Sequence, residues 1–92
     1  MKILIIEDSV RLADTIAEAL QNENYVVDTA NDGQLGYEHA STGIYDMVIL
    51  DLMLPKMNGY EVLSALRRDG DNVPVLILSA KTEIDDKIQG FT

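Results

Sequence analysis

Acidic side chains directly follow two strongly apolar segments of the sequence. Glu7 and Asp8 come after residues 3–6, and Asp51 comes after residues 48–50. Carboxylate oxygens bind hard divalent cations such as Mg²⁺, and a carboxylate beside such an ion can act as a nucleophile toward phosphorus. Ser79, after a third apolar segment, could donate a hydrogen bond to a phosphoryl oxygen. These residue types indicate metal-assisted phosphoryl chemistry, provided that the fold brings them together.

Strand-like and helix-like segments alternate along the chain and would position these side chains. Apolar runs at residues 3–6, 47–50 and 73–78 are typical of strands buried on both faces, and the more polar run at 25–30 is typical of an edge strand. Helical patterns follow at 9–22, 31–41, 58–70 and from 82 onward. The last three are predicted to begin at capping pairs: Asn31 with Gln34, Asn58 with Glu61 and Thr82 with Asp85.

This order predicts an α/β fold in which a doubly wound parallel sheet has helices on both faces, in one domain spanning residues 1–92. In such sheets ligands bind outside the carboxyl ends of the strands. Glu7, Asp8, Asp51 and Ser79 all follow strands there, so three carboxylates and a hydroxyl are expected at one rim. Asn31, after the second strand, is expected to be chemically quiet.

Composition excludes several classes of function. Seven Lys and Arg against sixteen Asp and Glu give a net charge of −9, which would repel nucleic-acid phosphates, so direct nucleic-acid binding is not expected. Cysteine is absent, which fits a reducing compartment. No apolar run approaches the roughly 20 residues of a membrane span, and the opening MKILIIED does not resemble a signal peptide. We therefore expect a cytoplasmic location.

Taken singly, the acidic signals have simpler interpretations. An acidic pair ahead of a helix commonly caps it, because negative charge is favourable at a helix N-terminus. Asp51 is harder to explain in this way, since the next predicted helix starts seven residues later. Hydrogen bonding of Asp51 to loop amides is the alternative.

Taken together, the segments resemble the receiver domain of two-component response regulators. The first strand and acidic pair of that family are similar to "ILIIEDS", its phosphoacceptor segment to "DLMLPKMNGYEVL", and its fourth strand, switch residue and fourth helix to "VPVLILSAKTEIDDKIQGF". The spacing most resembles OmpR/PhoB-type transcription regulators. The resemblance implies a flavodoxin-like three-layer sandwich with strand order 2-1-3-4-5.

The resemblance also implies roles for individual residues. Asp51 would be the phosphoacceptor, and Asp8 would bind Mg²⁺ directly. Glu7 would bind the ion directly or through water, and Met53 would supply a backbone carbonyl. Ser79 stands at the position of the family's switch hydroxyl.

The surrounding residues fit the same pattern. Ala80 matches the small residue that leaves room for a phosphoryl group, and Pro55 and Gly59 would shape the loop after Asp51. The phosphodonor histidine of such systems belongs to a sensor histidine kinase, the implied partner, so His39 is not given that role. The implied function is a phosphorylatable switch, without turnover of a substrate, that controls transcription through a separate DNA-binding domain.

One departure concerns the end of the sequence. The family continues with a fifth strand, a Lys-Pro step and a fifth helix, which these 92 residues do not include. Lys56 and Lys81 lie in predicted loops and do not replace the lysine of that step. With strand order 2-1-3-4 the fourth strand becomes an edge, so we expect a possible homodimer through the fourth strand and fourth helix.

Two other functions use a similar framework. A haloacid-dehalogenase-type phosphatase also has a strand-end aspartate nucleophile with Mg²⁺, but its D-x-D pattern needs a second acid where this sequence has Met53. A flavin- or nucleotide-binding flavodoxin-like domain needs a glycine-rich phosphate loop after the first strand, where this sequence reads EDSVRLAD. Both alternatives are disfavoured.

Overall fold

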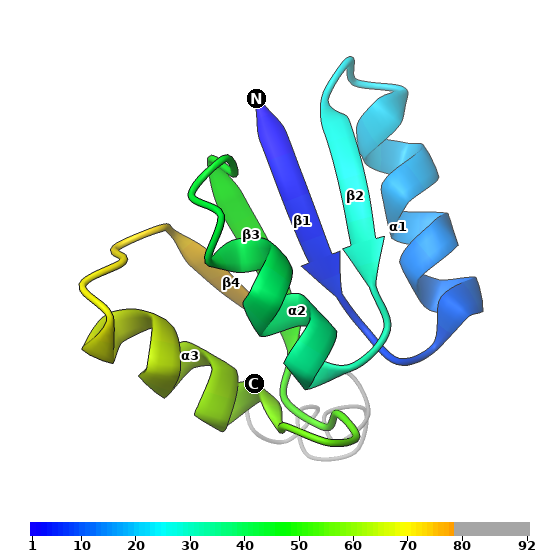
Figure 1. Ribbon diagram of the computed structural model, residues 1–92. Coiled ribbons are helices and arrows are strands. Elements are labelled where there is room, and N and C mark those ends of the chain that lie inside the picture. The colour runs from blue at the N-terminus through cyan, green and yellow to red at the C-terminus, as the bar shows by residue number, and fades with distance from the viewer. Residues whose placement is uncertain (79–92) are drawn as a thin grey trace, which may run out of the picture.

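The computed structural model describes residues 1–78, which form a parallel sheet between helices (Figure 1). The strands lie in the order β2-β1-β3-β4, and all three pairings are parallel. This arrangement confirms the predicted α/β doubly wound class. Along the chain the elements of this range are β1 (Lys2–Ile6), α1 (Val10–Gln21), β2 (Val26–Ala30), α2 (Gly33–Ala40), β3 (Met47–Asp51), α3 (Gly59–Arg68) and β4 (Val75–Leu78).

The hydrophobic core lies in two layers, one on each face of the sheet. Alternate residues of β1 point to opposite faces: Leu4 and Ile6 pack in the layer with α2 and α3, and Ile3 and Ile5 in the layer with α1. All four are at most 2 % exposed. A strand buried on both faces explains why its sequence is continuously apolar rather than alternating.

The two outer strands are less covered. The edge position of β2 confirms the expectation from its polar sequence, and Val26 at its start is 57 % exposed. β4 is the other outer strand of the part of the sheet that the structure describes, where Leu76 is 51 % and Ile77 38 % exposed. Homodimerisation through this strand stays a prediction.

β2 and β4 each begin later than the sequence predicts, and backbone hydrogen bonding explains both differences. Tyr25 was expected in the second strand, but its N–H donates to the carbonyl of Leu20 at the end of α1 (3.2 Å). β4 begins at Val75 rather than residue 73, after Pro74, which has no N–H to contribute to a ladder. The Pro74 carbonyl still accepts from Val48 N–H (2.9 Å).

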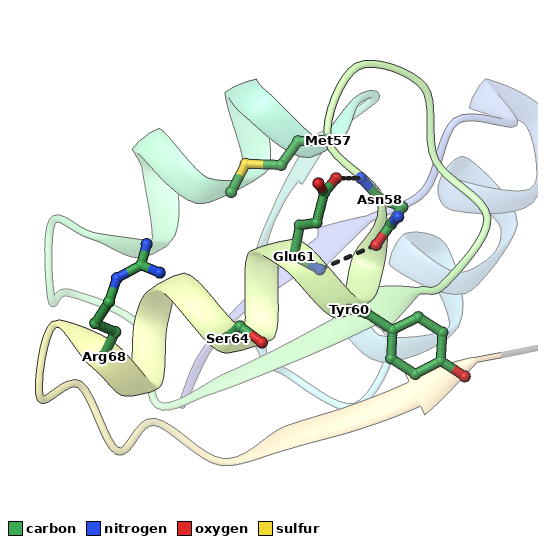
Figure 2. A pocket seen from close by; sticks show the side chains of 6 residues that line it. All are labelled: Met57, Asn58, Tyr60, Glu61, Ser64 and Arg68. Atoms are coloured by element: carbon green, nitrogen blue, oxygen red, sulfur yellow. Dashed lines mark hydrogen bonds between the residues drawn. The ribbon is translucent and has the colours of Figure 1, made fainter.

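Two of the three predicted capping pairs lie within residues 1–78, and one of these two predictions is wrong. Asn58 and Glu61 form the expected capping box at the start of α3, drawn as two dashed lines in Figure 2. The expected pairing of Asn31 with Gln34 does not form. Asp32 caps α2 instead, with its Oδ1 accepting from Leu35 N–H (2.7 Å), because the helix starts one residue later than predicted.

Several expectations fall on residues outside the described range. These are the roles of Ser79 and Ala80, the loop position of Lys81, and the fourth helix with its cap at Thr82 and Asp85. Among residues 1–78, no helix combines the length and the apolar character that crossing a membrane requires.

The capping box should contribute measurably to stability. Replacement Asn58→Ala removes the side chain that accepts from Glu61 N–H at 3.0 Å, and should lower the free energy of unfolding by about 1 kcal/mol. Asn58→Asp keeps an accepting oxygen and should retain most of it. Urea unfolding of the three proteins tests this, and equal losses in the two variants would contradict it.

Candidate functional site

Three carboxylates meet at the carboxyl end of the sheet. Glu7 and Asp8 follow β1, Asp51 ends the adjacent β3, and one ligand oxygen from each lies within 4.8 Å of the others. Glu7 and Asp51 are each 1 % exposed, whereas Asp8 is exposed. The three acids therefore lie together at one rim of the sheet, as predicted, and two of them are almost completely shielded from solvent.

Glu7 is held at both its backbone and its side chain. Its N–H donates to the carbonyl of Ala30 (3.0 Å), continuing the ladder between β1 and β2. Its Oε2 accepts from the N–H of Ser9 (2.9 Å), while the Ser9 hydroxyl accepts from Leu12 N–H and caps α1. Ser9 therefore links the start of α1 to the carboxylate cluster.

Burial raises the pKa of Glu7 to about 7, because the charged form is poorly solvated there. A hydrogen bond with Asp8, and the negative charge and hydrogen bond of Asp51, raise the pKa further, and the bond from Ser9 N–H opposes them. A bound cation would relieve the same repulsion. The cluster is therefore a set of hard oxygen donors, which is the kind of ligand that a divalent cation such as Mg²⁺ prefers.

Asp51 is positioned by the last residue of β3 and the loop that follows. Its Oδ1 accepts from the N–H of Met53 (3.2 Å). Gly59 N–H donates to the carbonyl of Leu52 (3.0 Å), and a Cβ at Gly59 would lie 2.4 Å from the Asp51 carbonyl oxygen. Only glycine allows α3 to start this close to β3, which supports the predicted role of Gly59 in shaping this loop.

The same loop also contacts α2. Pro55 contributes its carbonyl, which accepts from the N–H groups of Gly33 (3.3 Å) and Met57 (2.7 Å). Lys56 is exposed, as expected, with a positive φ of 68°. The loop between β3 and α3 is thus fixed against the first turns of two helices, which supports the predicted shaping role of Pro55.

A hollow of about 500 Å³ opens beside the cluster. Asp8 lies on its wall, and the loop after β3 and the start of α3 supply the rest: Leu52, Met53, Leu54, Pro55, Asn58 and Tyr60. A second hollow, of about 350 Å³, lies along α3 and is drawn in Figure 2. None of the three clustered carboxylates lines the second one, so of these two hollows the first is the one that borders the cluster.

Other residues singled out in the sequence lie away from the three acids or serve them differently. Met53 is 58 % exposed, and its backbone N–H donates to Oδ1 of Asp51. His39 lies in α2, half-buried, with Nδ1 2.9 Å from the Leu35 carbonyl oxygen. Asn31, expected to be quiet, donates from Nδ2 to the carbonyl of Glu7 (3.1 Å). No local sequence signal indicates that bond, because its partners are 24 residues apart.

Fold and cluster together define a class of protein: a parallel α/β domain with an acidic rim, suited to a divalent cation and a phosphoryl group. The family model of the response regulator receiver domain matches residues 3–92. The chain belongs to this family, whose members act as signalling switches in two-component systems.

Relatives of known kind support the same family. The chain is 42% identical over 91 residues to the probable transcriptional regulatory protein SilR of Salmonella typhimurium, and 43% identical over 91 residues to the transcriptional regulatory protein CiaR of Streptococcus pneumoniae. Each match covers 99% of this chain and 40% of the relative, so the chain spans about two fifths of their length.

Solved structures agree with the fold. The receiver domain of the Francisella response regulator 1452 has a TM-score of 0.83 at 31% identity, covering 98% of this chain and 74% of that one. The chemotaxis response regulator CheY4 of Vibrio cholerae has a TM-score of 0.82 at 30% identity, covering 98% and 77%.

The raised pKa of Glu7 predicts that the metal-free fold loses stability as the pH rises. Between the ordinary pKa near 4.5 and the folded pKa of about 7, the folded state binds more protons than the unfolded chain, so the free energy of unfolding falls across this range. Glu7→Gln should remove that part of the slope. Urea unfolding in a chelator from about pH 5 to about pH 8 measures it.

The matched control is Glu23→Gln, which changes an exposed glutamate just beyond α1. It should keep the pH dependence of the wild type. If Glu7→Gln and the wild type lose stability equally over this range, the protonation of Glu7 does not couple to folding.

Proposed function

We propose that this chain is the phosphoacceptor domain of a two-component response regulator, and that Asp51 accepts the phosphoryl group in a Mg²⁺-dependent reaction. The observation that carries the proposal is the convergence of Glu7, Asp8 and Asp51, with ligand oxygens within 4.8 Å of one another at the carboxyl end of a parallel sheet. Family membership supports the same function.

Asp51 suits the role of nucleophile better than its two neighbours. It ends the interior strand β3, and the bond from Met53 N–H to Oδ1 fixes the carboxylate. In the transfer, an oxygen of Asp51 would form a bond to phosphorus while the bond from phosphorus to the donor's leaving atom breaks. For a phosphohistidine of a sensor kinase, the leaving atom is an imidazole nitrogen, which keeps the electron pair and afterwards takes up a proton.

Mg²⁺ would be held by Asp8, by Glu7 directly or through water, by Asp51 and by the backbone carbonyl of Met53. When bound, the ion would neutralise part of the negative charge on the phosphoryl oxygens. The donor set fits, because all of these atoms are hard oxygens and Asp8 lies at the hollow through which a phosphodonor would approach. Ser79 would donate a hydrogen bond to a phosphoryl oxygen.

The partners follow from the same proposal. A sensor histidine kinase would supply the phosphoryl group, and in the full-length protein a separate DNA-binding domain would carry the output, since relatives are transcriptional regulatory proteins more than twice as long as this chain. With its strong negative charge, the domain itself would not bind DNA. The phosphatase alternative is not favoured, because Met53 can neither donate nor accept the proton that a second acid would.

Metal binding should depend on Asp8. Asp8→Asn removes a charge and a hard ligand, so Mg²⁺ affinity measured by titration calorimetry should fall roughly tenfold or more. Even loss of a residue that only supports a metal ligand typically weakens metal affinity by about tenfold to 100-fold. Asp14→Asn removes the same charge from an exposed position in α1 and should leave the affinity nearly unchanged. Equal affinities for wild type and Asp8→Asn would show that the cluster is not the metal site.

Phosphorylation should depend on Asp51 and on the metal. After incubation with acetyl phosphate and Mg²⁺, intact mass spectrometry should detect one added phosphoryl group on the wild type and none on Asp51→Ala. Chelation of Mg²⁺ should prevent labelling, because the transition-state charge is then not neutralised. Asp14→Asn serves again as the control and should be labelled. Full labelling of Asp51→Ala would refute the assignment of the phosphoacceptor.

A further inference from the structure

Asn31 lies at the rim of the sheet beside the carboxylates without being one of them. It directly follows β2, and its Nδ2 donates a hydrogen bond to the backbone carbonyl of Glu7 (3.1 Å). We propose that Asn31 is a positioning residue for the carboxylate cluster: it fixes the peptide group between Glu7 and Asp8, and thereby the arrangement of carboxylates that binds a divalent cation. The inference rests on the proposed function, because it concerns the same site.

The backbone ladder between β1 and β2 ends at Glu7. Its last backbone bond runs from Glu7 N–H to the carbonyl of Ala30. In a continuing parallel ladder, the carbonyl of Glu7 would next accept from the N–H of Asp32. Asp32 instead starts the turn into α2 and caps that helix. The Asn31 amide takes the place of the missing backbone donor, so the end of β1 remains bonded beyond the point where β2 has ended.

The bond from Asn31 fixes the peptide group that follows Glu7. The carbonyl of Glu7 belongs to the planar unit that joins Glu7 to Asp8. With its N–H bonded to Ala30 and its carbonyl bonded to Asn31, Glu7 is fixed on both sides of its Cα. The direction in which the chain enters Asp8 is then set as well. Asp8 is exposed and lacks the burial that holds Glu7, so its placement depends more on its backbone.

The negative charge of the cluster also favours an amide at residue 31. One ligand oxygen from each of three carboxylates already lies within 4.8 Å of the others. An aspartate at residue 31 would add a fourth negative charge and could not donate when ionised. A neutral amide supplies the donor without changing the charge of the cluster. Asn31 therefore meets both requirements of the position.

The experiment compares Mg²⁺ affinity in Asn31→Ala, Asn31→Leu and wild-type protein, by titration calorimetry at a temperature where all three are folded. Both Asn31 variants should bind Mg²⁺ roughly three- to tenfold more weakly than the wild type, which is the effect expected from the loss of one hydrogen bond. Both variants leave the cap of α2 at Asp32 intact. The amide resonance of Asp8 in the metal-free protein should also shift, since its peptide group loses its partner.

Two controls separate positioning from general loss of stability. Tyr45→Phe removes a hydrogen bond to Asp28 (2.6 Å) near the amino end of β3, far from the carboxylates, and should leave Mg²⁺ affinity unchanged. Asn22→Leu makes the same substitution at the C-terminal end of α1 and should also be neutral for Mg²⁺.

The outcomes are distinguishable. If wild-type protein binds Mg²⁺ and the Asn31 variants bind it equally well, the inference is overturned and the proposed function stands. If Tyr45→Phe weakens binding as much as Asn31→Ala, the effect is one of stability and the inference is likewise overturned. If the wild type does not bind Mg²⁺, the metal site of the proposed function fails and the inference fails with it.

Discussion

Repulsion among three carboxylates is the constraint on which the rest of this structure depends. Glu7, Asp8 and Asp51 present oxygens within 4.8 Å of one another, and two of these side chains are almost fully covered. Like charges so close, with little water between them, interact strongly. The raised pKa of Glu7 is the direct consequence. Packing elsewhere must therefore stabilise the domain enough to tolerate this rim, and the two apolar layers on β1 and β3 supply that packing.

The central strands also explain why the acids cannot simply move apart. Each apolar residue of β1 is buried in one layer or the other, and most of β3 is likewise buried, so neither strand can shift along its axis without exposing side chains. At its end, β3 enters a loop bonded to α2 through Gly33 and to α3 through Gly59. The repulsion is consequently held in a rigid frame, where a cation can relieve it without a large rearrangement.

The sequence predicts those features that depend on local pattern or on periodicity. Continuous apolar runs correctly predict the interior strands, and the spacing of Asn58 and Glu61 correctly predicts a capping box, because both partners lie within one helical turn. The position of Asp51 after an apolar run correctly predicts its place at the end of β3. The role of Asp51 as phosphoacceptor stays a proposal.

The features that sequence reasoning missed depend on long-range contacts. Asn31 and Asp32 are both good capping residues, and nothing local decides between them. The choice follows from the bond between Asn31 and the Glu7 carbonyl, which forms only once β1 and β2 are paired. In the same way, Glu7 and Asp8 are adjacent acids of equal promise in the sequence, yet one is buried and the other exposed.

Because Glu7 is buried and Asp8 is exposed, the two carboxylates contribute differently to the cluster. A buried carboxylate such as Glu7 sets the electrostatic cost of the site, because its charged form is poorly solvated. An exposed one such as Asp8, on the wall of the hollow, is in contact with solvent and with whatever enters the hollow. Asp51 combines burial with a carboxylate fixed by Met53 N–H, beside a loop bonded to two helices. A change of charge at Asp51 would therefore act next to a loop whose backbone is hydrogen-bonded to both α2 and α3.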